Sequence, residues 1–242
     1  MIVSNWKMNG SKESVEKWLN EVSKNIQPRE NNPCVFCPPA CYLDLSRKII
    51  NENSSLIKLG SQIIESSTQT ALTGGISSQM LKDYSTDYVL IGHSEQREHY
   101  KEDNISLRLK LNSAIKSQIS VIFCLGEPEE IKNNNQTQEF LIDQLELLEE
   151  EDFGLLTLAY EPIWAIGTGL KAENKYIDNI HRFLKNYCQT RFDLKQNVSV
   201  VYGGSVKLEN CEEILSSDNV DGLLIGGASL DPETFSKIYN FS

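Results

Sequence analysis

The sequence contains no run of apolar residues that approaches the ~18 needed to cross a membrane as a helix. Its first residues, 1–7, lack the basic start and the long apolar core of a secretory signal peptide. We therefore expect neither a membrane span nor secretion, and we expect the protein to be cytoplasmic.

Basic residues are scarce relative to acidic ones. The chain has 23 lysines and arginines against 34 aspartates and glutamates, which gives a formal net charge of −11. A chain with this charge repels polyanions, so nucleic acid and anionic membrane surfaces are poor partners for it. A small anionic ligand would need positive potential supplied locally, by a lysine, by helix N-termini or by backbone N–H groups.

The six cysteines include a single Cys-x-x-Cys motif, at Cys34 and Cys37, and no second motif that would complete a metal site. Both residues fall in an apolar run that is typical of a strand. Buried reduced thiols are therefore favoured over a metal or redox site. We expect no metal and no cofactor.

A strand pattern followed by a helix pattern recurs about eight times along the 242 residues, with no Pro-, Gly- or Ser-rich linker between halves. Apolar runs predict strands at 2–6, 33–37, 56–62, 87–91, 121–124, 155–160, 198–202 and 222–225. The clearest helix has apolar residues at 15, 18, 19, 22 and 26, with Ser11 as its cap. This alternation favours an α/β fold, a (β/α)₈ barrel of eight parallel strands ringed by helices, as one domain over 1–242.

Further helix patterns predict helices at 42–49, 77–84, 107–114, 137–150, 177–187 and 232–239. We interpret residues 133–135 as a polar loop. The acidic run at 149–152 is interpreted as a solvated helix end.

Polar residues or glycines fall at the ends of several predicted strands: Lys7, His93, Glu161, Ser205 and Gly226. The carboxyl ends of the strands of a closed parallel barrel meet at one rim, where such folds place their active sites. We therefore expect these residues to converge. Taken alone, Glu161 is equally consistent with a turn that carries one solvated carboxylate. A lone histidine at a strand end more often makes a structural hydrogen bond, and a lone lysine is more often solvated.

Five segments resemble motifs of the triosephosphate isomerase family, in the family's order and at its spacing. They are Asn-Trp-Lys-Met-Asn-Gly at 5–10, Ile-Gly-His-Ser-Glu at 91–95, Glu-Pro-Ile-Trp-Ala-Ile-Gly-Thr-Gly at 161–169, Tyr-Gly-Gly-Ser-Val at 202–206 and Gly-Leu-Leu-Ile-Gly-Gly-Ala-Ser-Leu at 222–230. The resemblance covers nearly the whole chain and implies a TIM barrel.

The resemblance implies an aldose–ketose isomerase of glycolysis and gluconeogenesis. It would interconvert dihydroxyacetone phosphate and D-glyceraldehyde 3-phosphate through an enediolate. Glu161 would be the base and His93 the electrophile, a pairing that is the established template of this family. Ser94 and Glu95 follow His93 as a helix start would, and a ring at a helix N-terminus is favoured in its neutral form.

The resemblance also assigns two residues at the end of the first strand to catalysis and substrate binding. Lys7 would supply the compact cation that a phosphate or an enediolate oxygen needs in an acidic protein. Asn5 would help to orient the substrate, and Glu95 would lie near Lys7.

The glycine-rich ends of the last two strands would bind the substrate phosphate, because glycine lets backbone N–H groups approach its oxygens. The expected contacts are Ser205, Gly226, Gly227 and, from a lid, Gly167. Ordinary tight turns have similar sequences, and other phosphate-binding barrels share this feature.

A lid would protect the reactive enediolate from water. The resemblance assigns it to Pro162, Ile163, Trp164, Ala165, Ile166, Gly167, Thr168 and Gly169. Leu170 and Lys171 depart from the family's usual second hinge. This departure puts the kinetics of opening and closing in doubt and leaves the chemistry in place.

The resemblance implies a homodimer in which a loop, here Thr73, Gly74 and Gly75, enters the neighbouring subunit. Three positions depart from the family: Ile63 replaces an Asn, Gly75 replaces a Glu and Gln96 replaces an Arg. In relatives this Glu typically pairs with this Arg. Because both charges are missing together, no buried charge is stranded, and we expect the dimer to persist with altered interface polarity.

Two alternatives remain open from the sequence. Another sugar-phosphate isomerase or lyase on the same barrel would explain the glycine-rich loops but not the polar residues at the other strand ends. A catalytically silent barrel used as a binding scaffold has no support, since every chemical group is present.

Overall fold

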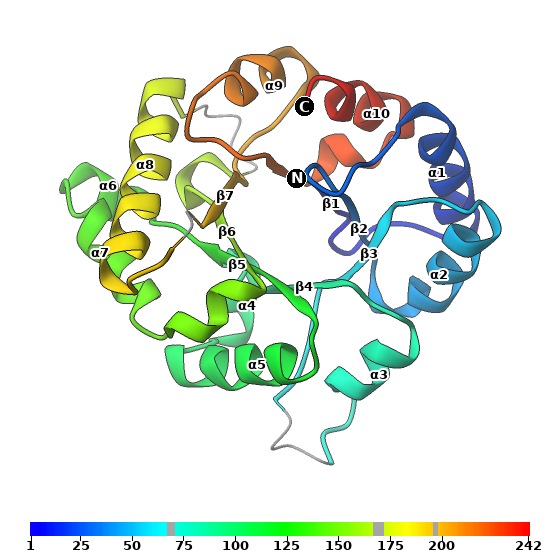
Figure 1. The fold of residues 1–242 in the computed structure, drawn as a ribbon, viewed down its shortest axis with the longest axis horizontal. Helices are drawn as coiled ribbons and strands as arrows, with labels where there is room; N and C mark the ends of the chain where they lie inside the picture. The colour runs from blue at the N-terminus through cyan, green and yellow to red at the C-terminus, as the bar shows by residue number, and fades with distance from the viewer. Residues whose placement is uncertain (67–70, 167–171, 196–197) are drawn as a thin grey trace.

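A computed structural model describes residues 1–66, 71–166, 172–195 and 198–242. Within these residues the strands form a closed barrel in chain order, each parallel to the next, and β8 pairs with β1 so that Ile225 lies beside Ser4. Figure 1 shows the strands at the centre and the helices around them. The predicted TIM barrel is confirmed.

The strands are β1 (Ile2–Asn5), β2 (Cys34–Cys37), β3 (Lys58–Ser61), β4 (Tyr88–Ile91), β5 (Ser120–Leu125), β6 (Leu156–Tyr160), β7 (Ser199–Tyr202) and β8 (Leu223–Ile225). The helices are α1 (Lys12–Asn25), α2 (Leu43–Glu52), α3 (Ser78–Asp83), α4 (Ser94–Tyr100), α5 (Asn104–Lys116), α6 (Glu129–Asn133), α7 (Thr137–Leu145), α8 (Asn174–Arg191), α9 (Leu208–Leu215) and α10 (Pro232–Asn240). Short 3₁₀ turns lie at η1 (Ala40–Tyr42), η2 (Glu150–Gly154), η3 (Ile163–Ala165) and η4 (Gly227–Ser229).

Helix α1 forms as its sequence predicts. Ser11 caps it by accepting a hydrogen bond from the backbone N–H of Ser14 at 3.2 Å, which satisfies a donor that the first turn leaves free. The apolar stripe of the helix is buried at Val15, Trp18 and Leu19, where it packs against the barrel.

Side chains alternate along each strand, so one set fills the barrel and the other faces the helices. One buried cluster lies inside and consists of Val3, Val35, Cys37, Leu90, Ile122, Cys124, Ala159, Val201 and Leu224. Cys34 and Cys37 are fully buried free thiols, as predicted. Burial raises the pKa of both thiols, which keeps them in the unreactive protonated form.

The acidic run after α7 differs from its prediction. The helix ends at Leu145, and Asp152 is only 3% exposed. The carboxylate of Asp152 accepts hydrogen bonds from the Arg108 guanidinium of α5 and from the backbone N–H of Glu149, which is 2.8 Å away. The prediction of a solvated helix end is therefore wrong for Asp152, because an arginine more than 40 positions away neutralises its charge.

The predicted polar loop at 133–135 is also partly wrong. Asn133 is the last residue of the short helix α6, and Asn135 then adopts a left-handed backbone with φ of 57°. Asparagine tolerates this conformation better than most residues, so it ends the helix here.

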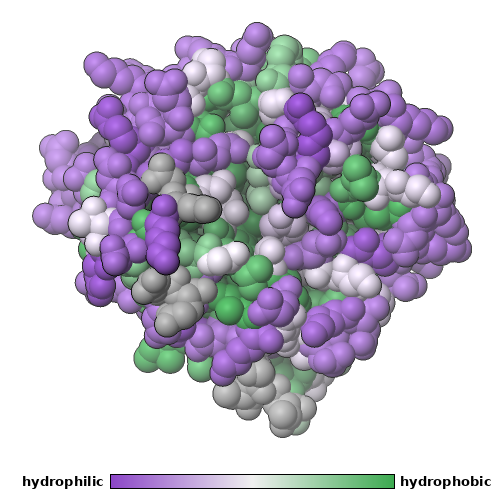
Figure 2. Space-filling model, viewed as in Figure 1, coloured by the Kyte–Doolittle hydropathy of each residue, from purple (hydrophilic) through white to green (hydrophobic). Residues whose placement is uncertain are grey.

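In the view of Figure 2, hydrophilic side chains cover most of the periphery, whereas hydrophobic ones gather toward the middle. Among the described residues, no helix combines the length and the apolar character that a bilayer crossing requires.

Candidate active site

A pocket of about 520 Å³ opens at the carboxyl ends of strands β1, β4, β6, β7 and β8. Its lining includes Asn5, Lys7, His93, Glu161, Ser205, Gly226 and Gly227. The fold thus brings together residues that are up to 222 positions apart in the sequence, all at the one rim where parallel strands end.

Glu161 follows β6 and is almost fully buried, with 2% of its surface exposed. Its backbone N–H donates to the carbonyl of Leu125 at 2.8 Å, so the rigid edge of strand β5 fixes its position. One carboxylate oxygen, Oε1, lies 3.3 Å from Nε2 of His93. The other, Oε2, accepts a hydrogen bond from the backbone N–H of Ser94 at 3.3 Å.

His93 is the N-cap of helix α4, as the sequence indicates. Its Nδ1 accepts a hydrogen bond from the backbone N–H of Glu95 at 3.2 Å. An imidazole nitrogen that accepts a hydrogen bond carries no proton, so a neutral ring must hold its proton on Nε2. This nitrogen faces Glu161, and the helix start thereby selects the tautomer that directs a donor toward the carboxylate.

Lys7 lines the same pocket as this pair and has an unusual backbone. Its φ is 52°, in the left-handed region that residues other than glycine adopt only at a cost of about 1–2 kcal/mol. The backbone N–H of Lys7 donates to Oδ1 of Asn5 at 3.0 Å, which helps to hold this conformation. Its ammonium lies 2.7 Å from Oε1 of Glu95. Burial opposes ionisation of Glu95, but the hydrogen bond from Lys7 and the neighbouring positive charges outweigh it and lower the pKa of this carboxyl.

Two glycines make room for Glu161, one beside its side chain and one beside its backbone. A Cβ at Gly203 would lie 2.8 Å from Cγ of Glu161, and a Cβ at Gly126 would lie 1.8 Å from the carbonyl oxygen of Glu161. Both separations are shorter than van der Waals contact. Any larger residue at either position would therefore displace Glu161.

The glycine-rich segments after β7 and β8 form the other wall of the pocket. A Cβ at Gly226 would lie 3.5 Å from Cε of Lys7, so this loop runs alongside the lysine side chain. A Cβ at Gly227 would meet nothing within 4 Å. The hydroxyl of Ser205 donates to the carbonyl of Ala165 at 2.6 Å and so joins this wall to the start of the predicted lid.

The described part of the predicted lid runs from Pro162 to Ile166 and contains the turn η3, in which Trp164 and Ala165 are buried. The remaining lid residues, Gly167, Thr168 and Gly169, and the second-hinge residues Leu170 and Lys171 lie outside the described residues.

Glu127 is a buried carboxylate beside the lid that the sequence analysis missed. It is fully buried and accepts hydrogen bonds from the Tyr160 hydroxyl at 3.0 Å, from Nε1 of Trp164 at 2.9 Å and from the Tyr176 hydroxyl at 2.9 Å. Burial, together with this negative charge, raises the pKa of Tyr160 well above its ordinary value. The sequence did carry a signal, because Glu127 lies two residues after the end of strand β5, close to a strand end as Glu161 is.

The predicted dimer loop lies away from the pocket. The backbone N–H of Gly75 donates to the carbonyl of Leu72 at 3.1 Å and closes a turn. Together with Ile63 and Gln96, this turn lines a separate cavity of about 570 Å³. A Cβ at Gly75 would lie 3.1 Å from Cγ of Glu65, so a neighbouring carboxylate-bearing side chain occupies the space beside this glycine.

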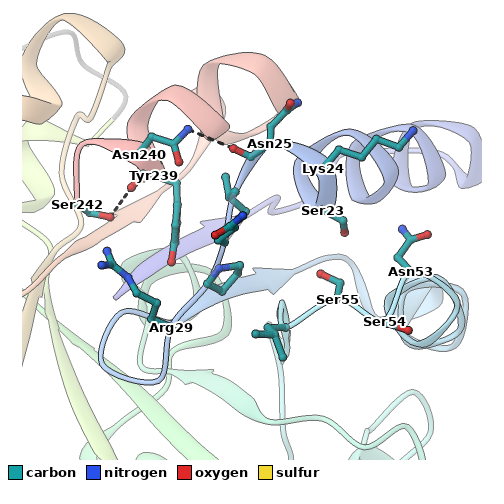
Figure 3. A pocket seen from close by; sticks show the side chains of 14 residues that line it. Ser23, Lys24, Asn25, Arg29, Asn53, Ser54, Ser55, Tyr239, Asn240 and Ser242 are labelled. Atoms are coloured by element: carbon teal, nitrogen blue, oxygen red, sulfur yellow. Dashed lines mark hydrogen bonds between the residues drawn. The ribbon is translucent and has the colours of Figure 1, made fainter.

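A pocket of about 720 Å³ lies at the opposite end of the barrel, where helices lead into strands. Figure 3 shows its lining of mostly amide and hydroxyl side chains, with Arg29 and Tyr239 at one side. Its lining residues include no histidine, aspartate or glutamate to act as an acid or a base. Among the described residues of the chain, no group of three or more His, Cys, Asp or Glu side chains is arranged to hold a metal.

A closed (β/α)₈ barrel with glycine-rich loops after its seventh and eighth strands is a common frame for binding phosphorylated small molecules. A buried carboxylate that faces an imidazole can move protons to and from carbon. The fold and the pocket therefore define a barrel of the class that performs acid–base chemistry on phosphorylated substrates.

Comparison with known proteins specifies the class further. A family model described as triosephosphate isomerase matches residues 1–242. The chain belongs to the triosephosphate isomerase family. It is similar to the triosephosphate isomerases of Thermodesulfovibrio yellowstonii (39% identical, 99% of this chain and 98% of the relative), Finegoldia magna (38%, 100% and 98%) and Trichodesmium erythraeum (37%, 100% and 98%).

Proposed function

We propose that this chain interconverts dihydroxyacetone phosphate and D-glyceraldehyde 3-phosphate, the reaction that gives its family its name, by proton transfer through an enediolate. Glu161 is the base and His93 the electrophile. The observation that carries the proposal is the 3.3 Å approach of Oε1 of Glu161 to Nε2 of His93 in a buried pocket. A small substrate that enters beside both groups would contact the base and the acid at once.

In the forward direction the carboxylate of Glu161 takes a proton from the carbon next to the substrate carbonyl. The electron pair of the broken C–H bond forms the C=C bond of the enediolate, and negative charge moves to the carbonyl oxygen. The Nε2–H of His93 donates a hydrogen bond to this oxygen. The proton of the substrate hydroxyl on the adjacent carbon then passes to this oxygen, relayed by Nε2 of His93. Return of the proton from Glu161 to the former carbonyl carbon gives the isomer, with no net change in atoms or electrons.

Lys7 and Asn5 assist in binding and orienting the substrate. The ammonium of Lys7 adds positive charge in a protein whose net charge of −11 would otherwise repel a phosphate ester. Ser94 supports the site by holding Glu161 through its backbone N–H, and Glu95 supports it by pairing with Lys7. These supporting contacts favour a base and a cation that stay in place before the substrate arrives.

The substrate phosphate is bound by Ser205, Gly226 and Gly227, with Gly167 added when the lid closes. Backbone N–H groups in these glycine-rich segments approach the oxygens without side-chain hindrance. The lid at 162–169 keeps water from the enediolate, which would otherwise eliminate phosphate. No cofactor is required by this chemistry.

The proposal extends to the setting of the enzyme. We place it in the cytoplasm, in glycolysis and gluconeogenesis, as a single-domain subunit of a homodimer whose contacts include the loop at Thr73, Gly74 and Gly75. Sedimentation that shows only monomers at micromolar concentration would reject the dimer.

The test of the activity is a coupled assay on D-glyceraldehyde 3-phosphate that compares the wild type with Glu161→Gln. Loss of a general base lowers kcat by about 10²–10⁴-fold, so the variant should be nearly inactive while keeping its fold. Near-equal rates for the two proteins would eliminate the proposed function. Activity on another sugar phosphate alone would instead indicate a different enzyme on the same barrel.

A further inference from the structure

Lys132, in the short helix α6, has an unusual partner. Its ammonium lies 3.3 Å from the centroid of the Trp164 ring, well inside the range of about 6 Å in which a cation is attracted to an aromatic face. It also lies 5.7 Å from the centroid of the Tyr176 ring. Within the part of the chain that the structure describes, Lys132 has no carboxylate within ion-pair distance.

The two rings lie near the two ends of the predicted lid in the sequence. Trp164 belongs to turn η3, just before residue 167, and Tyr176 lies in the first turn of helix α8, just after residue 171. Their ring centroids are 6.0 Å apart at an interplanar angle of 68°, the edge-to-face geometry that aromatic pairs favour. Glu127 accepts a hydrogen bond from Nε1 of Trp164 and from the hydroxyl of Tyr176. The ammonium of Lys132 therefore contacts the same pair through the ring faces.

We propose that Lys132 is a positioning residue that holds the two ends of the lid together by placing its ammonium over Trp164 and Tyr176. The inference rests on the proposed function, and it adds to it a residue that touches no substrate. Trp164 is only 8% exposed and Lys132 is half-buried, so the contact is partly shielded from water and is stronger than one at an open surface.

A pre-ordered hinge matters because closing a lid over the substrate must be driven by binding energy. If Lys132 no longer orders the indole, part of the energy gained by binding the phosphate is used to order it, and catalytic efficiency falls. A substrate without a phosphate gains no phosphate-binding energy that could drive closure of the lid. The effect should therefore appear with D-glyceraldehyde 3-phosphate and be absent with D-glyceraldehyde.

The experiment measures kcat/KM on both substrates for the wild type, Lys132→Met and Lys132→Arg. We expect Lys132→Met to lower kcat/KM for the phosphorylated substrate by about fivefold, which corresponds to about 1 kcal/mol. Lys132→Arg keeps a cation that stacks on aromatic faces and should restore most of the loss. Lys82→Met removes a charge from an exposed lysine of α3 and is the control for the change in net charge.

A double-mutant cycle isolates the contact. In a Trp164→Leu background the nearer ring face is absent and only the more distant Tyr176 ring remains, so Lys132→Met should have a much smaller effect. An equal loss on both substrates, an undiminished loss in the Trp164→Leu background, or no loss at all would each overturn the inference.

A second readout separates this inference from the proposed function. The fluorescence of Trp164, taken as the difference between the wild type and Trp164→Leu, should change when Lys132 becomes Met and return with Arg. Unchanged emission would overturn the contact, whether or not the protein isomerises triose phosphates. An inactive wild type would overturn the function and leave the emission test intact.

Discussion

Nε2 of His93 and Oε1 of Glu161 face each other at 3.3 Å, while the other ring nitrogen of His93 accepts from the backbone at the start of helix α4. Both nitrogens of the imidazole are thereby assigned by geometry. The helix start and the carboxylate act on opposite ends of one ring, and the first prediction separates their effects.

His93→Asn should retain the fold and lose activity. Asparagine is a good N-cap and can still satisfy the first turn of α4, but its shorter amide does not reach the position of Nε2. Loss of one hydrogen bond to a developing oxyanion lowers kcat by about 10²–10³-fold. Steady-state kinetics and a thermal midpoint measure the two effects. A variant with wild-type kcat would show that Nε2 has no part in the reaction.

Gly203→Ala should impair the enzyme by displacing its base. The added Cβ would lie 2.8 Å from Cγ of Glu161, so the carboxylate must shift. A displacement near 1 Å can lower the rate by about 10²-fold. Gly154→Ala, where an added Cβ meets nothing within 4 Å, is the matched control and should keep wild-type kcat/KM. Equal activity of the two variants would contradict the steric argument.

His181 should make the free energy of unfolding depend on pH. Burial lowers the pKa of His181 to about 3 against an ordinary value of 6.5, with Asp178 and Lys185 as its charged neighbours. Between these two values the unfolded chain binds a proton that the folded chain does not, so stability falls as the pH is lowered through this range. The expected loss is about 1 kcal/mol per pH unit between pH 6 and pH 5. Urea unfolding at both pH values should show a smaller loss for His181→Gln, and an identical loss would refute the assignment.

Glu127→Gln should weaken the hinge without touching the substrate. The amide keeps one acceptor but turns an NH₂ group toward hydroxyl and indole donors. Donors left without an acceptor in a buried place cost about 1–3 kcal/mol of stability. Tyr176→Phe removes a single donor and should cost less. Chemical denaturation of both variants provides the comparison, and a Glu127→Gln protein as stable as the wild type would contradict it.

Asp152→Ala should lower stability and leave catalysis unchanged. The buried carboxylate pairs with Arg108, neither of which lines the pocket, and its removal leaves the guanidinium with Glu149 and the carbonyl of Leu147. We expect a loss of about 2 kcal/mol, less than for a fully buried pair because Arg108 is partly exposed. Glu149→Ala, at an exposed partner, should cost under about 1 kcal/mol. The free energies of unfolding of the two variants distinguish a buried Asp152–Arg108 ion pair from a solvated helix end. Equal losses for the two variants would contradict the buried pair.

The barrel and much of the pocket could be predicted from the sequence because they depend on local patterns. Apolar runs and helical stripes fix the alternation of elements, and a parallel barrel collects whatever follows each strand. Lys7, His93 and Glu161 were therefore found without coordinates. The roles that the family resemblance gives them remain predictions until the variants are measured.

Other features could not be predicted because they depend on partners distant in sequence. The burial of Asp152 follows from an arginine 44 positions earlier, and the aromatic contacts of Lys132 follow from residues on two other elements. No sequence pattern around Lys7 predicts a left-handed backbone. Glu127 is an intermediate case. Its position near the end of a strand could be read from the sequence, but the three side chains that donate hydrogen bonds to it could not.

The left-handed backbone of Lys7 limits how this position can change. Glycine or asparagine would relieve the strain but would delete the ammonium, whereas arginine would keep a cation and inherit the strain. No single replacement improves both properties together. A saturation library at this codon should therefore separate into well-folded proteins that lack the cation and strained proteins that carry an altered cation. Lysine keeps its charge in the site at the cost of a strained backbone.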